Sequence, residues 1–334
     1  MQFSQLQRRE FITTLLSGAA AVWPLAASAQ QTEQMRRVGV LMMSGQDGAD
    51  QPSVMRLAQR MRDLGWIEGR NIRIDVRWSE GDLEKARANA KALAETSDVI
   101  VTQGAIATRI AREQTGTIPI VFWLVPDPVG LGLVSNLARP EGNVTGFTNL
   151  EWSIASKWLE LLREFKPSII RASLLFNPDV APYADHFMAN LKDAGSRLGV
   201  TVSAMHARNV AQIETAMTAF ADGNLTGLLV LPDALTVIHL EQIVKLAMHL
   251  RLPAIYPYRM FAVAGGLVSY GVNVPEHAGQ AATYIDRILK GEQPGSLPVQ
   301  APTKFELVVN IKTAEALNLT VPQIMQMTAD EAIE

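Results

Sequence analysis

Short polar turns follow several apolar runs in this sequence, and one of them has the residues of an anion-binding turn. Thr102-Gln103-Gly104-Ala105 lies between an apolar run and an amphipathic stretch. Backbone N–H groups at such a strand-to-helix junction can hold a carboxylate at the positive end of the helix dipole, and Gly104 permits close approach. The alternative is that Thr102 and Gly104 make only a tight turn and a cap. The segment alone does not separate the two interpretations.

Two aspartates occupy similar junctions further along the chain. Asp127 lies between two prolines at a predicted strand end, and Asp233 precedes a helical stretch. Each carboxylate could bind a ligand ammonium or cap the helix that follows it. We expect one of the two, and not both, to bind an ammonium group.

Aromatic residues gather at the same junctions and would suit a planar or apolar solute. Ordinary packing of amphipathic rings is the alternative for each of them. The aromatic residues are Trp123, Phe176, Tyr183, Tyr256, Tyr258 and Tyr270.

In open parallel sheets, ligands lie beyond the carboxyl ends of the strands, and this rule selects the candidate ligand-binding residues. They are Ser44, Gln46, Thr102, Gly104, Ala105, Asp127, Asn177, Tyr183, Asp233, Tyr256, Arg259 and Tyr270.

The motifs of common catalytic and metal sites are missing from the sequence. The five histidines include no pair at i, i+4 spacing, and the chain has no cysteine. There is no GxSxG nucleophile motif and no P-loop lysine motif. We therefore expect no catalytic residue, no metal site and no cofactor.

Alternating apolar runs and amphipathic stretches predict the elements that position these residues. The pattern of strand and crossover helix runs through 36–147 and restarts over 150–271, which predicts an α/β fold with two doubly wound, mostly parallel sheets. Three crossings between the lobes are expected, at Val144–Phe147, near Gly265–Val272 and after Pro298. We expect part of 273–296 to return to the first lobe, 297–325 to close on the second, and 326–334 to form a tail.

Composition limits the partners of the protein. The chain is 48% hydrophobic with a formal net charge of −3, which argues against disorder and against electrostatic binding of nucleic acid. No later segment has an apolar run of membrane-spanning length, so we expect no direct membrane insertion once the signal has been removed. We expect a monomer.

The N-terminus has the parts of an export signal. Arg8-Arg9-Glu10-Phe11-Ile12 precedes an apolar stretch over 12–27, and Ala27-Ser28-Ala29 predicts cleavage after Ala29. Residues 1–29 are thus a predicted signal peptide, and Pro24 disfavours the alternative of a membrane anchor. The paired arginines resemble a twin-arginine signal, although ordinary secretory signals also carry such pairs. We expect a periplasmic protein.

Several extended motifs, in order along the whole chain, resemble the ABC transporter substrate-binding protein family that is related to tryptophan- and tyrosine-type uptake receptors. Besides the N-terminal signal, these motifs are Leu64-Gly65-Trp66-Ile67-Glu68-Gly69-Arg70-Asn71, Asp127-Pro128-Val129, Arg139-Pro140-Glu141-Gly142-Asn143-Val144-Thr145-Gly146, Gly265-Gly266-Leu267-Val268-Ser269-Tyr270-Gly271 and Pro302-Thr303-Lys304-Phe305-Glu306-Leu307-Val308-Val309-Asn310.

The resemblance implies a periplasmic-binding-protein fold of the leucine-binding type, joined by a three-strand hinge. It also implies a small-molecule solute, such as an amino acid or aromatic acid, and ABC permease and ATPase subunits as partners. A sugar-repressor-like ligand sensor without its DNA-binding segment is the alternative function, and a periplasmic enzyme is a further one. The export signal and the missing helix-turn-helix disfavour the sensor.

Overall fold

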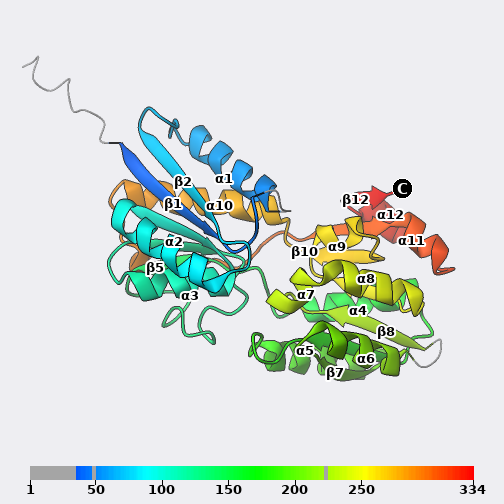
Figure 1. The fold of residues 1–334 in the computed structure, drawn as a ribbon. Helices are drawn as coiled ribbons and strands as arrows, with labels where there is room; N and C mark the ends of the chain where they lie inside the picture. Colours follow the sequence, from blue (N-terminus) through cyan, green and yellow to red (C-terminus); the bar gives the residue numbers. More distant parts are fainter. Residues whose placement is uncertain (1–34, 47–49, 222–224) are drawn as a thin grey trace, which may run out of the picture. The chain divides into compact units, whose positions relative to one another are not determined.

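The computed structural model describes residues 35–46, 50–221 and 225–334. The predicted signal peptide and its cleavage site lie outside the described residues. Within 36–334 the chain forms one compact unit that contains two sheets (Figure 1).

The first sheet has five parallel strands in the order β2-β1-β3-β4-β5. The strands are β1 (Arg36–Met42), β2 (Ile72–Trp78), β3 (Val99–Gln103), β4 (Ile120–Trp123) and β5 (Val144–Phe147). The helices that connect the first four strands are α1 (Gln51–Asp63), α2 (Leu83–Thr96) and α3 (Gly104–Gln114).

Alternating side chains of these strands build one core on each face of the first sheet. Val38, Val40 and Met42 of β1 belong to the core that includes α1 and α10 (Val274–Leu289). Leu41, which points to the other face, belongs to the core that includes α2 and α3. Burial on both faces explains why the strands read as nearly continuous apolar runs.

The second sheet has seven strands in the order β12-β11-β10-β9-β8-β6-β7. The strands are β6 (Arg171–Phe176), β7 (Thr201–His206), β8 (Thr226–Val230), β9 (Ala254–Tyr256), β10 (Val268–Gly271), β11 (Glu306–Asn310) and β12 (Glu331–Ile333). The helices around it are α4 (Ile154–Phe165), α5 (Ala184–Leu198), α6 (Val210–Phe220), α7 (Ala234–Ile238), α8 (Leu240–His249), α9 (Arg259–Val263), α11 (Ile311–Ala316) and α12 (Gln323–Thr328).

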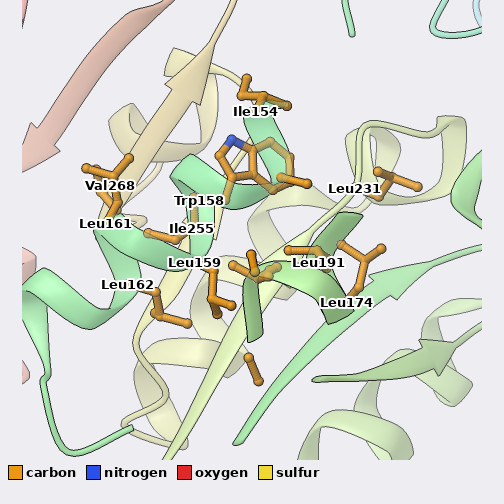
Figure 2. Packing of buried hydrophobic residues seen from close by; sticks show 14 of the residues in the cluster. Ile154, Trp158, Leu159, Leu161, Leu162, Leu174, Leu191, Leu231, Ile255 and Val268 are labelled. Carbon is orange, nitrogen blue, oxygen red and sulfur yellow. The ribbon is translucent and has the colours of Figure 1, made fainter. Parts of the chain in front are cut away.

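Trp158 of α4 anchors one face of this second sheet. Figure 2 shows its indole among leucine and isoleucine side chains from α4 and the neighbouring strands. The ring is buried, and its indole N–H donates a hydrogen bond to the Tyr270 carbonyl at 2.8 Å, so its polar atom is satisfied.

The prediction of two doubly wound α/β lobes is confirmed.

Helix α10 follows the second sheet in the chain but packs against the first. It lies against α1, and its Asp286 accepts a hydrogen bond from the Trp66 indole at 2.9 Å. A short 3-10 turn, Pro294–Ser296, follows α10, and the chain then re-enters the second sheet at β11. The segments that connect the two sheets are therefore 148–153, 272–273 and 297–305.

The C-terminal residues differ from the predicted tail. Residues 331–333 form β12, which pairs in parallel with β11, and β11 is antiparallel to β10. The Asp330 carboxylate accepts the Leu307 N–H at 2.8 Å and joins the two segments just ahead of the strand pairing. A contact over 23 residues leaves no local pattern in the sequence, so the strand was not predicted.

Candidate functional site

The turn from β3 into α3 has an open helix N-terminus. Gly104 begins α3 with a φ of +75°, a left-handed conformation that favours glycine. No side chain caps this helix, so its first N–H groups have no side-chain acceptor. The Gln103 amide donates instead to Asp50 at 2.8 Å, which fixes a carboxylate beside the turn.

Thr102 has a structural role in the same turn. Its side chain is completely buried, and its hydroxyl lies 2.8 Å from the Thr108 hydroxyl. The Thr108 hydroxyl also donates to the Gly104 carbonyl at 2.7 Å. Thr102 therefore orients the turn, while Gly104 and Ala105 are half-buried at its surface.

Asp127 caps its own turn through one carboxylate oxygen. This oxygen accepts the Gly130 N–H at 2.9 Å, and the side chain remains partly exposed. A carboxylate has two acceptor oxygens, and the second oxygen of Asp127 is the one that could contact a ligand.

Two further polar atoms at the carboxyl edge of the first sheet are buried without a hydrogen-bond partner. They are the Ser44 hydroxyl, which follows β1, and the Trp123 indole N–H at the end of β4. Unpaired buried groups of this kind are uncommon in native proteins. Gln46 is exposed, and it adjoins 47–49, which are not described.

In the second lobe, Asp233 joins two loops at the carboxyl edge of the sheet. Its carboxylate accepts the Asn177 N–H at 2.8 Å and the Thr236 N–H at 2.9 Å, and Thr236 completes a capping box on α7. Burial raises the pKa of Asp233, and these N–H donors oppose the shift. Asp233 is therefore engaged as a helix cap.

Tyr183 lies beside this cap and is buried. Its hydroxyl donates to the Pro232 carbonyl at 2.6 Å. Burial raises the pKa of Tyr183 well above its usual value, and the nearby acidic groups of Asp233, Tyr258 and Asp127 add to the shift. Asp127 belongs to the first lobe, and its contribution is the smallest of the three.

A hydrogen bond joins the first connecting segment to the loop after β9. The Asn149 amide donates to the Tyr258 hydroxyl at 2.6 Å, and both side chains are buried. Burial raises the pKa of Tyr258, the bond to Asn149 opposes this shift, and Asp50 of the first lobe adds to it. The Asn149 amide oxygen is buried and has no partner.

Three of the sequence-predicted residues lie apart from this group. Tyr256 is 1% exposed and stacks on Phe261 with ring centroids 5.1 Å apart. Arg259 forms a two-bond ion pair with Glu331 at 2.5 and 2.6 Å. Tyr270 is half-buried with its ring 5.6 Å from Phe305. The structure gives these three side chains intramolecular partners, and their contact with a solute stays a prediction.

The candidate site is therefore defined by the residues that the structure brings together at the two carboxyl edges. These are Asp50, Gln103, Gly104, Ala105, Asp127, Asn149, Asn177, Tyr183, Asp233 and Tyr258. Sequence reasoning missed Asp50 and Asn149. Applying the strand-end rule to Phe147 would have identified Asn149, whereas Asp50 lies at the far end of the segment that follows β1, beside α1, where the rule gave no signal.

The described part of the chain contains no group of three or more histidine, aspartate or glutamate side chains placed to hold a metal ion. None of the described helices has both the length and the apolarity that a membrane crossing requires.

Comparison with known proteins assigns the chain to a family. A curated relative, the tyrosine-binding protein of Clostridioides difficile (strain R20291), is 25% identical over 275 residues, which cover 81% of this chain and 79% of the relative.

Two solved structures have similar folds. A conserved domain protein from Vibrio cholerae is 28% identical with a TM-score of 0.80, and the match covers 90% of this chain and all of the other. An ABC domain from Streptococcus pneumonia in complex with L-Trp is 22% identical, with the same TM-score and coverage. The family model described as ABC transporter substrate binding protein matches residues 37–333. The chain belongs to the ABC transporter substrate-binding protein family.

Proposed function

We propose that this chain is the extracytoplasmic solute-binding receptor of an ABC importer, and that it captures an amino acid or aromatic acid between its two lobes. The family binds solutes and is not a family of enzymes. One relative is named a tyrosine-binding protein, and a structure of similar fold contains L-Trp.

The observation that best supports this proposal is the meeting of charged and aromatic groups from both lobes. Asp127 of the first lobe influences the titration of Tyr183 in the second, and Asn149 of the connecting segment bonds Tyr258. A solute held here would contact both lobes and the segment that connects them.

The chemistry of the candidate site fits a zwitterion. The uncapped N–H groups at the start of α3 suit a carboxylate, because the helix dipole is positive there. Asp127 and Asp50 offer carboxylate oxygens to an ammonium group, and Asp50 is already oriented by Gln103. Both oxygens of Asp233 accept backbone N–H groups, whereas only one oxygen of Asp127 does, so Asp127 is the better ammonium partner of the two acids first considered.

Capture proceeds by hinge closure in this proposal. The solute docks on one lobe, the other lobe adds contacts in the closed form, and the solute shifts the population towards closure. The membrane permease recognises the closed receptor, and the ATPase drives import. The receptor works as a monomer in the periplasm, after export by the secretory or the twin-arginine route.

Calorimetric titration with matched analogues tests the zwitterion geometry. An amino acid that binds should lose about 10- to 100-fold in affinity on Asp127→Asn, because one charge-assisted hydrogen bond contributes about 1.5–3 kcal/mol. Its des-amino analogue should bind both proteins equally, since it lacks the group that Asp127 contacts.

Asp179→Asn is the matched control, because Asp179 is an exposed carboxylate paired with Arg208. The proposed role of Asp127 is wrong if both variants bind the amino acid as the unmodified protein does. Receptor function would still stand in that case, with a different residue holding the ammonium group.

A further inference from the structure

A cavity lies where the second and third connecting segments meet α10. Its volume is about 270 Å³, and its walls come from the first turns of α10, from residues 302–306 and from Asp330. None of the residues of the candidate site lines it. We call it the hinge cavity, because α10 packs against the first sheet whereas residues 306–310 belong to the second.

Glu306 is an acidic side chain of this cavity that forms no ion pair with another described residue. It is half-buried, and its two oxygens accept only long hydrogen bonds from the Asn273 amide, at 3.2 and 3.3 Å. In the described part of the chain, no lysine, arginine or histidine lies within ion-pair distance of Glu306. Burial raises the pKa of Glu306, which reflects the cost of holding this charge with little solvation.

The cationic side chains near Glu306 either form ion pairs with other carboxylates or are exposed to solvent. Arg259 forms its ion pair with Glu331, and Arg56 pairs with Glu276 at 2.9 Å. Lys304 also lines the cavity, but its side chain is exposed and forms no ion pair within the described ranges. The cavity therefore has three carboxylates, from Glu276, Glu306 and Asp330, against one lysine.

His277 adds a buried acceptor to the same wall. It is 3% exposed, and one ring nitrogen, Nε2, lies 2.8 Å from the Thr148 carbonyl oxygen. Burial lowers the pKa of His277 to about 4, so the ring is neutral and Nε2 carries the proton that it donates to this carbonyl. The other nitrogen, Nδ1, is then an acceptor, and it is buried without a partner.

We propose that the hinge cavity is a second ligand site, which binds a small organic cation through the Glu306 carboxylate. Val272, Pro302 and Phe305 supply apolar walls for a short hydrocarbon stem. An ammonium group needs acceptors, and Glu306 and His277 provide them from α10 and from the start of β11. The matching ligand is an alkylamine or a short diamine.

Calorimetry of the full chain with n-butylamine and 1,4-diaminobutane tests this proposal, with butyramide as the uncharged comparison. We expect saturable binding of at least one amine and none of butyramide. Glu306→Gln should weaken the amine at least tenfold, since it keeps the shape but removes the charge. Glu241→Gln is the control, because Glu241 is an exposed helix carboxylate whose partner is also exposed.

A second variant tests the cavity independently, in case Glu306→Gln fails to fold. Gln280→Trp places a large ring in the cavity from an exposed position of α10, and it should also abolish amine binding. The proposal fails if no amine binds saturably, or if Glu306→Gln and Glu241→Gln bind the amine equally. It also fails if an amino-acid solute displaces the amine competitively, because the amine would then occupy the candidate site. None of these outcomes removes the proposed receptor function, which is measured by titration of the solute itself.

Discussion

The Asp233 carboxylate accepts the N–H group of Asn177, which is 56 residues away in the chain, and the N–H group of Thr236 in the first turn of α7. It thereby ties the loop after β6 to the N-terminus of α7, with Tyr183 bonded to the neighbouring Pro232 carbonyl. At this edge of the sheet, single side chains hold the backbone of the candidate site in place.

Replacement of Asp233 should show how much these hydrogen bonds contribute to the free energy of unfolding. Asp233→Ala removes two hydrogen bonds to a charged acceptor, so we expect a loss of about 2–4 kcal/mol in the free energy of unfolding. Asp233→Asn retains a good cap oxygen and should lose clearly less. Urea unfolding of both variants measures the difference, and equal losses would contradict the capping role.

His277 predicts a pH dependence of stability. Its pKa is about 4 in the folded protein, against an ordinary value of 6.5, because the ring is buried. Between these pH values the unfolded chain binds the extra proton, so stability falls as the pH falls. The contribution of His277 to the free energy of unfolding is fully present above pH 6.5. Lowering the pH to 4 should reduce the free energy of unfolding by about 3 kcal/mol.

His277→Gln provides the comparison, because glutamine can still donate to the Thr148 carbonyl but does not titrate. We expect the unmodified protein to lose more stability than this variant between pH 7 and pH 4.5, by denaturant unfolding at each pH. Parallel pH profiles would show that His277 does not titrate with the predicted shift.

The sequence could predict the candidate site only as a set of residues that follow the predicted strands. The rule for carboxyl edges located Gly104, Asp127 and Asp233, because it needs only the order of strands and turns. It could not show that the Thr102 hydroxyl is bonded to Thr108, or that Arg259 is paired with a residue 72 positions away. Such pairings depend on the tertiary fold.

At the scale of elements, β10 shows how tightly the chain packs where it leaves the second sheet. A methyl group on Gly271 would lie 1.8 Å from the Pro257 carbonyl oxygen, so only glycine fits at the end of this strand. The apolar runs predicted the strands well, because each core strand is buried on both faces. They could not predict β12, which is held to β11 by long-range pairing.

Gly271→Ala should destabilise the protein by about 3 kcal/mol, since the added methyl must displace backbone rather than a flexible side chain. Gly116→Ala is the matched control, because a methyl group there meets no atom within 4 Å. We expect the control to change the free energy of unfolding by less than about 0.5 kcal/mol. Similar thermal midpoints for the two variants would refute the packing argument.

At the scale of the whole molecule, the segments that connect the two sheets are 148–153, 272–273 and 297–305. The proposed closure requires the backbone to bend within these segments. Asn149 and Tyr258 join one of these segments to the second lobe. If a solute favours a closed form, the dimensions of the chain in solution should depend on that solute.

Small-angle X-ray scattering should therefore show a smaller radius of gyration when a binding solute is added. An unrelated solute at the same concentration serves as the control and should leave the radius unchanged. Binding without compaction would contradict the hinge-closure part of the proposal but not solute binding.

A thermal-shift screen of the chain against amino acids, aromatic acids and other small solutes tests solute capture most directly. Partial unfolding and refolding beforehand removes any bound ligand. A specific solute at 100 times its dissociation constant should add about 2.7 kcal/mol of stability. We predict a clear rise in melting temperature for one chemical class, without turnover of the compound. The absence of a shift across the amino acids and aromatic acids would contradict the proposed solute class, and turnover would contradict a receptor.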